Sequence, residues 1–268
     1  MSVRYAIFIT GGASGIGRAI ARHFAARDWF VGLADVDEAM MAETKAMLPT
    51  GLASTHRLDV RDRAAWDEAL AAFAAAAGGG IHVVANNAGI PLGGALEDNS
   101  REEIDRCLDV NLKGAIYGAQ AALPFLRGSA PDACLLNTAS AAGIYGTSGA
   151  SVYSATKFGV RALTESLDGE WSEHGIRVRS LMPAFIDTPL LSHNPNALSN
   201  GAIRDRVRDA GLEITPVEQV AEAAWNAVHG DRLHTLVGAT AHRLSFAARW
   251  MPGRLRKMAR GTAGAMGR

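Results

Sequence analysis

The chain has 268 residues, of which 48% are hydrophobic and 20% are charged, a composition typical of a soluble globular protein with a buried core. Its formal net charge is zero, so no nucleic-acid partner is expected, and its apolar stretches fall short of the ~20 residues that cross a bilayer. The first residues run directly into a strand-like segment, so no cleavable leader is expected. Neither the two cysteines, Cys107 and Cys134, nor the histidines have metal-site spacing. A cytoplasmic protein without a metal is therefore expected.

Strand-like apolar runs alternate with helical patterns along most of the chain. The expected order is strand 5–10, helix 16–26, strand 29–34, helix 37–48, strand 54–60, helix 62–77, strand 81–86, helix 100–127, strand 133–140, helix 150–173, strand 176–182 and strand 233–238. This alternation predicts parallel βαβ units in one doubly wound α/β sheet. No shift in composition marks a domain boundary, so we expect one domain over residues 1–238 and a dependent basic extension over residues 239–268.

The first strand ends in the glycine-rich turn TGGASGIG. Its glycines let the backbone bend tightly, and the helix that follows presents free N–H groups and the positive end of its dipole to a pyrophosphate. Because the turn lies between the first strand and the first helix, it predicts a nucleotide site formed by Gly11, Ser14, Gly15, Ile16 and Gly17. S-adenosylmethionine proteins use a similar turn, so this motif alone leaves both ligands open.

The second strand ends in Asp35, eighteen residues after Gly17. A carboxylate at this point can accept hydrogen bonds from both ribose hydroxyls of adenosine and would repel a 2′-phosphate. Ser14 and Val36 are neutral where a phosphate would favour a base. The sequence therefore predicts NAD rather than NADP, with the alternative that Asp35 caps the next helix, a role that Asp37 can also fill.

Further motifs follow in the chain: NNAG at 86–89, Asn111, Ser140 and YSATK at 153–157. Together with the glycine turn, and in this order, they make the chain resemble the short-chain dehydrogenase/reductase family over roughly residues 5–190. The resemblance implies hydride transfer between a nicotinamide cofactor and an alcohol or ketone. It also implies a Rossmann-like, mostly parallel seven-stranded sheet with helices on both faces.

The resemblance also assigns individual residues. It places Asp59 at the adenine, Thr188 at the nicotinamide amide, and along the cofactor Val60, Asn86, Ala88, Gly89, Pro183 and Ile186. Asn87 is expected to brace the sheet instead. The resemblance makes Asn111 a helix distortion and water site that relays protons to Lys157. Where the family usually has glycine after the sixth strand, this chain has Ala184, so a small backbone shift near the nicotinamide is expected.

The chemistry of the YSATK motif can be argued from its residues. Tyr153 and Lys157 stand one helical turn apart. Hydride removal from a carbinol needs a general base, and a phenol with a pKa of ~10 is too weak unless a nearby ammonium and the oxidised nicotinamide lower its pKa. Ser140, which by itself would be a turn cap, can hydrogen-bond the substrate oxygen. We therefore predict Asn111, Ser140, Tyr153 and Lys157 as the catalytic residues of an oxidoreductase acting on CH–OH groups.

The expected substrate pocket is apolar. Its predicted lining, next to a lid over residues 189–215, is Leu92, Ile144, Tyr145, Phe185, Leu190 and Leu191. These side chains favour a hydrophobic secondary alcohol or ketone. The sequence leaves open an NADPH-dependent ketone or 3-oxoacyl reductase, and a non-catalytic dinucleotide-binding protein.

The C-terminal part of the chain is strongly basic. After Asp231 it has eight basic residues and no acidic one, so the preceding part carries a net charge of minus eight. In the expected helix the apolar residues Leu244, Ala247, Ala248 and Met251 share a face, and Pro252-Gly253 interrupts it. Two interpretations remain open: a basic amphipathic anchor on an anionic membrane, or an appended helix packed on the body or on a sister subunit. The extension puts the family's tetramer in doubt, so we expect a homodimer through helices 100–127 and 150–173, or a homotetramer.

Overall fold

Seven parallel strands form the centre of the protein. In this computed structural model the backbone is described for residues 4–266 and the side chains for residues 4–260. The strands are β1 (Ala6–Thr10), β2 (Phe30–Asp35), β3 (Ala53–Arg57), β4 (Val83–Asn86), β5 (Cys134–Thr138), β6 (Arg177–Pro183) and β7 (His234–Val237). Their order in the sheet is β3-β2-β1-β4-β5-β6-β7, and every described pair is parallel. The order reverses between β1 and β4, which makes the carboxyl ends of these two strands the expected ligand site.

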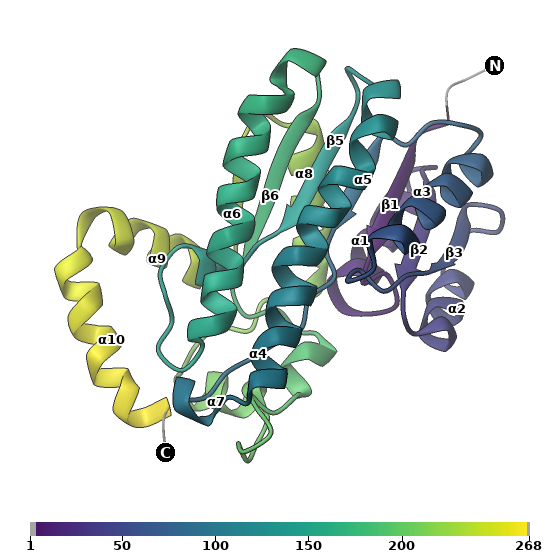
Figure 1. The fold of residues 1–268 in the computed structure, drawn as a ribbon. Coiled ribbons are helices and arrows are strands. Elements are labelled where there is room, and N and C mark those ends of the chain that lie inside the picture. The colour runs from purple at the N-terminus through teal and green to yellow at the C-terminus, as the bar shows by residue number, and fades with distance from the viewer. Residues whose placement is uncertain (1–3, 267–268) are drawn as a thin grey trace.

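Helices cover both faces of the sheet, as Figure 1 shows. One face is covered by α3 (Arg63–Ala77), α5 (Gly114–Gly128) and α6 (Ser151–Trp171), and the other by α1 (Gly15–Ala25), α2 (Glu38–Ala46) and α8 (Val217–His229). The predicted doubly wound α/β fold is therefore confirmed. The single helix expected over 100–127 is instead α4 (Arg101–Leu108), a π-helical turn (Asp109–Lys113) and α5. Among residues 4–266, no helix is long and apolar enough to cross a bilayer.

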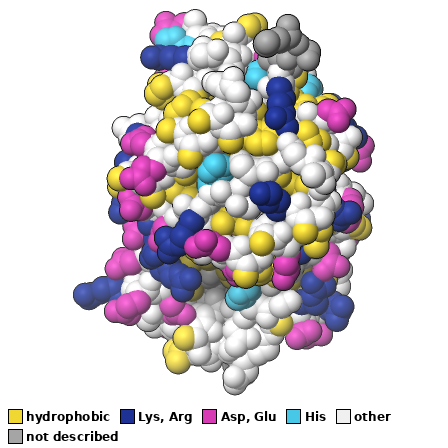
Figure 2. All heavy atoms as spheres, turned by 90° about the vertical axis from the view of Figure 1, so that its right-hand side faces the viewer, with side chains coloured by type: hydrophobic (Ala, Val, Ile, Leu, Met, Phe, Trp, Pro, Cys, Tyr) yellow, Lys and Arg dark blue, Asp and Glu magenta, His cyan; other side chains and the backbone are white. Residues whose placement is uncertain are grey.

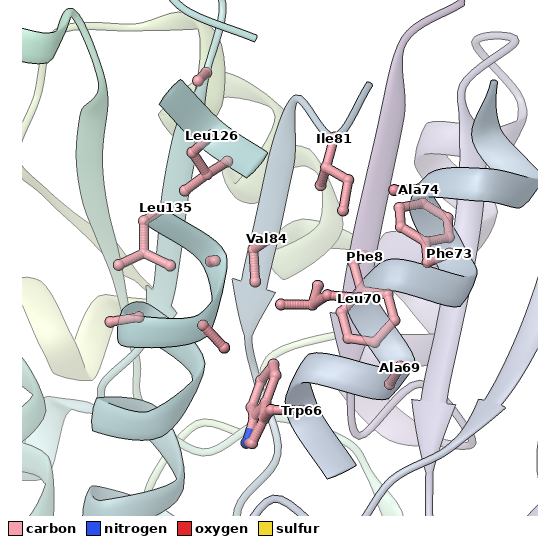
Figure 3. Packing of buried hydrophobic residues seen from close by; sticks show 14 of the residues in the cluster. Phe8, Trp66, Ala69, Leu70, Phe73, Ala74, Ile81, Val84, Leu126 and Leu135 are labelled. Atoms are coloured by element: carbon pink, nitrogen blue, oxygen red, sulfur yellow. The ribbon is translucent and has the colours of Figure 1, made fainter. Parts of the chain in front are cut away.

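The larger core cluster lies between the sheet and α3 and α5 (Figure 3). Phe8 from β1 packs against Trp66 and Phe73 of α3, with ring centroids 6.2 and 5.3 Å apart. The Phe73 ring lies so close to β2 that a Cβ on Gly32 would come within 2.5 Å of it, so this close approach needs a glycine. The Trp66 indole N–H donates to the Val60 carbonyl oxygen at 3.1 Å, which ties the core to the loop after β3.

Replacing Trp66 by alanine is expected to lower the free energy of unfolding by about 3–5 kcal/mol, because a fully buried ring and its hydrogen bond are lost. Urea denaturation followed by circular dichroism measures this change. Trp250→Ala is the matched control, since Trp250 is 66% exposed and should change stability by less than about 0.5 kcal/mol. Equal effects of the two substitutions would contradict this description of the core.

The C-terminal residues form two helices, α9 (Ala239–Trp250) and α10 (Pro252–Met266), joined at Met251. Of the four apolar residues expected on one helix face, Leu244, Ala247 and Ala248 lie in α9 and Met251 follows it, and all four are half-buried. The predicted interruption at Pro252-Gly253 coincides with the start of α10. Arg268, the last basic residue of the chain, lies outside the described residues.

Candidate active site

The glycine turn connects β1 to α1 at the carboxyl edge of the sheet. Gly11 and Gly15 have φ angles of 65° and 51°, in the left-handed region that favours glycine. A Cβ on Gly17 would overlap the Gly11 carbonyl oxygen. Since α1 begins at Gly15, its first N–H groups open toward this turn, which is the arrangement that binds phosphate groups.

Asp35 lies at the end of β2, beside this turn. Its carboxylate accepts hydrogen bonds from the backbone N–H groups of Ala13 at 3.2 Å, Val36 at 2.8 Å and Asp37 at 3.2 Å. The cap of α2 is Asp37, whose carboxylate accepts from the Met40 N–H at 2.9 Å. Asp35 is therefore not the helix cap, and its carboxylate is held in one orientation next to the glycine turn.

Arg18 of α1 supports the turn from behind, and sequence reasoning missed it. Its guanidinium donates to the Ala13 carbonyl oxygen at 2.7 and 3.1 Å and to the Thr44 hydroxyl at 2.8 Å, and lies 3.6 Å from Glu43. The partners on α2 are 25 and 26 residues away in the chain, a distance at which no local spacing reveals the contact. Arg18 thus fixes the backbone that in turn holds Asp35.

The residues expected at the adenine follow β3. The Asp59 carboxylate pairs with the Arg61 guanidinium, with a shortest separation of 2.6 Å, and this hydrogen-bonded cation holds the pKa of Asp59 below its usual value. Val60 is buried, and its carbonyl oxygen accepts from Trp66. Asp59 therefore already has a cationic partner within the protein.

Asn86, expected at the cofactor, uses its side chain inside the protein. Its amide donates to the Ala115 carbonyl oxygen of α5 and to the Asn137 side chain of β5, both at 3.0 Å. Asn137 in turn donates to the Thr164 hydroxyl at 3.0 Å. This buried chain of amides and hydroxyls joins β4, β5, α5 and α6, and within the described residues it leaves the Asn86 side-chain oxygen buried without a hydrogen-bond partner.

Asn87 links three neighbouring strands. Its amide donates to the Thr10 carbonyl oxygen of β1 at 2.9 Å, and its oxygen accepts from the Thr138 hydroxyl of β5 at 3.3 Å. The Thr10 hydroxyl accepts from the backbone N–H groups of Asn87 and Ala88 at 3.0 and 3.1 Å. Asn87 thus braces the sheet, as predicted. The Ala88 backbone lies close to the glycine turn, since a Cβ on Gly11 would be 3.0 Å from the Ala88 Cα.

Lys157 reaches from α6 into the interior. It is 4% exposed, and its ammonium donates to the Thr138 carbonyl oxygen at 2.9 Å and lies 5.7 Å from the centroid of the Tyr153 ring. Gly89 makes room for it, since a Cβ there would lie 3.5 Å from the Lys157 Nζ. Burial lowers the pKa of Lys157 to about 8, because the charged form is poorly solvated.

Tyr153 lies on the same helix beside Ser140. Burial raises the pKa of Tyr153 to about 12, and a hydrogen bond with the Ser140 side chain offsets part of this rise. The sequence predicts that the neighbouring ammonium and an oxidised nicotinamide together lower this pKa; in the protein by itself, desolvation of the phenolate is the largest effect. At neutral pH the Tyr153 hydroxyl therefore holds its proton and can donate it.

Ser140 follows β5 and begins the short 3-10 turn Ala141–Gly143. Its hydroxyl accepts from the Ala142 N–H at 3.1 Å and donates to the Pro183 carbonyl oxygen of β6 at 3.4 Å. It is thus both the turn cap that its sequence position suggests and a neighbour of Tyr153.

Asn111 lies in the π-helical turn between α4 and α5. Its amide exchanges two hydrogen bonds with the Ile90 backbone, at 2.8 and 2.9 Å, and lies 3.4 Å from the Cys107 sulfur and 3.5 Å from the Thr156 hydroxyl. A cavity of about 10 Å³, the size of one water molecule, is lined by Asn111 together with Asn86, Thr10 and Thr138. The helix distortion is therefore present beside a polar cavity.

The segment after β6 closes the other side of the site. Thr188 lies against the glycine turn, with its Cβ 3.3 Å from where a Cβ on Gly15 would stand, and its hydroxyl donates to the Ile186 carbonyl oxygen at 3.3 Å. Ile186 itself is buried in the core cluster between the sheet and helices α1 and α8. Ala184 keeps a negative φ and extends the pairing of β6 with β7, because its N–H donates to the Val237 carbonyl oxygen at 3.1 Å.

The predicted pocket residues differ in their surroundings. Leu92 and Leu191 are buried, Tyr145, Phe185 and Leu190 are half-buried, and Ile144 packs on the small core cluster of Ala139, Val160 and Met182.

The segment predicted as a lid, residues 189–215, lies on the loop before α4. The Gly93 N–H donates to the Pro195 carbonyl oxygen at 2.7 Å, and the Ala197 N–H donates to the Glu103 carboxylate at 2.8 Å. Glu103 also accepts from the Ser100 N–H, so one carboxylate caps α4 and binds the backbone of Ala197.

Comparison with known proteins agrees with this arrangement. A sequence profile of the short chain dehydrogenases matches residues 5–198. The chain is 37% identical over 191 residues to the 2,5-dichloro-2,5-cyclohexadiene-1,4-diol dehydrogenase of Sphingobium indicum, covering 70% of this chain and 75% of that protein. It is 35% identical over 199 residues to a 3-alpha-(or 20-beta)-hydroxysteroid dehydrogenase of Mycobacterium tuberculosis, covering 73% and 74%. A short chain dehydrogenase/reductase from Burkholderia phymatum, solved in complex with NAD, superimposes with a TM-score of 0.83 at 26% identity, covering 96% and 97%. Because the profile spans most of the chain and these relatives are matched over most of their length, the chain belongs to the short chain dehydrogenase family.

Proposed function

We propose that this protein is an NAD-dependent oxidoreductase that interconverts a hydrophobic secondary alcohol and its ketone. The observation that supports this most directly is the half-buried Tyr153, whose hydroxyl is hydrogen-bonded to Ser140 and whose ring centroid lies 5.7 Å from the Lys157 ammonium. This group lies at the same sheet edge as the glycine turn and Asp35, so a proton donor and a dinucleotide cradle share one site.

The residues present fit a nicotinamide dinucleotide. The turn at Gly11, Gly15 and Gly17 leaves no space for side chains and opens onto the start of α1, as a pyrophosphate requires. Asp35 is oriented for the adenosine ribose, and Thr188 and the Pro183 backbone border the opposite side. When bound, the nicotinamide ring accepts or supplies the hydride.

The proton chemistry rests on the protein's own side chains. In ketone reduction, the Tyr153 hydroxyl donates its proton to the substrate oxygen while Ser140 orients that oxygen. In alcohol oxidation the phenolate takes up the same proton, and the Lys157 ammonium stabilises the negative charge. The polar cavity beside Asn111 has room for one water molecule. In this proposal that water relays protons between Lys157 and the interior of the protein.

Asp35 should determine the choice of cofactor. Asp35→Ala is expected to raise the KM for NAD by about 10–100-fold, since charged hydrogen bonds to the ribose are lost, and to improve the relative use of NADP. Steady-state kinetics with both cofactors measure this. Asp37→Ala is the matched control, because it removes a neighbouring carboxylate that caps α2 and should keep the NAD preference. A preference of the unaltered protein for NADPH over NADH would contradict the proposal and favour an NADPH-dependent ketone or 3-oxoacyl reductase.

The substrate class is proposed from the apolar residues near the lid. The relatives include a ring diol dehydrogenase and a hydroxysteroid dehydrogenase by name, which agrees with a hydrophobic alcohol. Incubating the protein with NAD and a panel of cyclic, aromatic and aliphatic secondary alcohols, followed by NADH absorbance, identifies the substrate. Absence of NADH formation and of ketone reduction across the panel would favour a non-catalytic dinucleotide-binding protein.

We further propose that two copies associate through α4, α5 and α6. Exposed apolar side chains on these helices, Leu108, Ile116 and Phe158, support such a contact. Sedimentation velocity of the full chain measures the oligomeric state.

A further inference from the structure

The outer face of α9 combines aromatic and basic side chains. Its exposed residues are spaced three or four apart, so they share one face of the helix. They are Ala239, His242, Arg243, Phe246, Arg249 and Trp250. Phe246 and Trp250 are 60% and 66% exposed, and the Arg249 guanidinium lies 5.3 Å from the Trp250 ring centroid. Two large aromatic rings thus face solvent with arginines on either side.

The opposite side of α9 and α10 is anchored to the protein. Ala241 is fully buried, and the Ser148 hydroxyl donates to the Ala259 carbonyl oxygen of α10 at 3.0 Å. Between the two helices lies an open hollow of about 310 Å³, lined by Ala247, Met251, Arg254, Leu255 and Met258. We call residues 239–260 the arm. Since its inner side has partners, the aromatic face of α9 is its outer surface.

The charge of the arm has one sign. Its basic residues are Arg243, Arg249, Arg254, Arg256, Lys257 and Arg260, and it has no acidic residue. On α10, Arg256, Lys257 and Arg260 are exposed while Leu255 and Ala259 are half-buried, so the cations lie on the outer side. Figure 1 shows the arm on the α6 side of the molecule, away from α2 and β3. Figure 2, which faces the opposite side, shows acidic and basic side chains interspersed.

This combination discriminates between possible partners. A symmetric contact between the arms of two copies would bring like charges together, which is unfavourable. A bilayer surface rich in anionic phospholipids supplies negative charge to the arginines and an interfacial layer in which tryptophan and phenylalanine side chains are stable.

We propose that the arm docks on an anionic phospholipid surface, with Phe246 and Trp250 entering the headgroup layer and the arginine and lysine side chains pairing with lipid anions. The hydrogen bond between Ser148 and Ala259 ties the arm to the loop that leads into α6, the helix of Tyr153. Docking would therefore bring the substrate side of the protein close to a lipid phase. The proposal concerns binding only and does not depend on the catalytic proposal above.

Sedimentation of the full chain with lipid vesicles tests the docking. The protein should sediment with phosphatidylcholine vesicles that contain phosphatidylserine, and remain in solution with phosphatidylcholine alone or at high salt, where surface charges are screened. Because the other four tryptophans are buried or half-buried, emission on vesicle binding should shift to shorter wavelength mainly through Trp250. Equal binding to both vesicle types, or to neither, would overturn the proposal.

Paired variants locate the binding surface. Arg256→Glu/Lys257→Glu/Arg260→Glu is expected to weaken vesicle binding by about 100-fold or more, given the attraction of each cation to an anionic surface. The matched control reverses three exposed cations elsewhere, Arg22→Glu/Lys45→Glu/Arg57→Glu, and should bind as the unaltered protein does. Equal loss in both sets would indicate non-specific charge attraction and overturn the assignment to the arm.

The aromatic residues are tested in the same way. Phe246→Ser/Trp250→Ser should abolish the emission shift and most of the binding, whereas Met47→Ser, which removes an exposed apolar side chain from another surface, should not. Circular dichroism checks that each variant is folded. If Phe246→Ser/Trp250→Ser instead changes the oligomeric state in sedimentation velocity and leaves vesicle binding intact, the face is a contact between copies and the lipid proposal is wrong.

Discussion

Replacing Tyr153 by phenylalanine is expected to lower kcat for both alcohol oxidation and ketone reduction by about 10²–10⁴-fold, the usual contribution of a positioned general acid or base. The substitution removes one oxygen from a half-buried ring, and the hydroxyl it removes is the proposed proton donor beside Ser140. Stopped-flow or steady-state NADH absorbance with the best alcohol and its ketone measures the loss.

The substitution should leave binding and folding intact. The affinity for NAD, measured by calorimetry, should change by less than a factor of about two, because the predicted phosphate and ribose contacts come from the glycine turn and Asp35. Tyr117→Phe is the matched control, since that half-buried tyrosine lies on α5 outside the candidate site. Turnover near that of the unaltered protein in Tyr153→Phe would refute the proposed mechanism.

The arrangement of strands could be predicted from local patterns because each parallel strand is a short apolar run followed by a helix. The break at Asp109–Lys113 could not be predicted from periodicity, since VNLKGA continues a helical pattern. What stabilises it is a contact between distant segments, the pair of hydrogen bonds between Asn111 and Ile90. Only the resemblance to a known family pointed to a distortion there.

In the candidate site, too, local motifs could be predicted from the sequence and contacts between distant segments could not. The glycine turn and the pair Tyr153 and Lys157 are local motifs, so their spacing was sufficient to place them. The use of the Asn86 side chain inside the protein and the contacts of Arg18 with α2 depend on tertiary packing and have no local signal. The pKa of Tyr153 is equally non-local. It is raised because the folded chain desolvates the phenolate, an effect that the four-residue spacing to Lys157 does not reveal.

Lys157 should control how alcohol oxidation depends on pH. In the proposed mechanism, the species that oxidises the alcohol has a Tyr153 phenolate beside a Lys157 ammonium. At low pH this species forms by loss of one proton, so the rate should rise with pH. Above the Lys157 pKa of about 8 the dominant form has already lost that proton. The reactive species then differs from it only by transfer of the Tyr153 proton to Lys157. The rate should therefore level off near pH 8, well below the Tyr153 pKa of about 12.

Lys157→Met removes the ammonium and with it this plateau. At pH 7 and saturating cofactor, oxidation should fall by about 10–1,000-fold, the effect of a neighbouring opposite charge on a pKa. The deficit should narrow above pH 8, because the variant's rate continues to rise while that of the unaltered protein is constant. Lys45→Met, at an exposed lysine on α2, should retain the plateau. A pH-independent ratio between Lys157→Met and the unaltered protein would show that Lys157 acts only by holding the cofactor, since loss of a cofactor contact has no reason to follow the titration of a lysine.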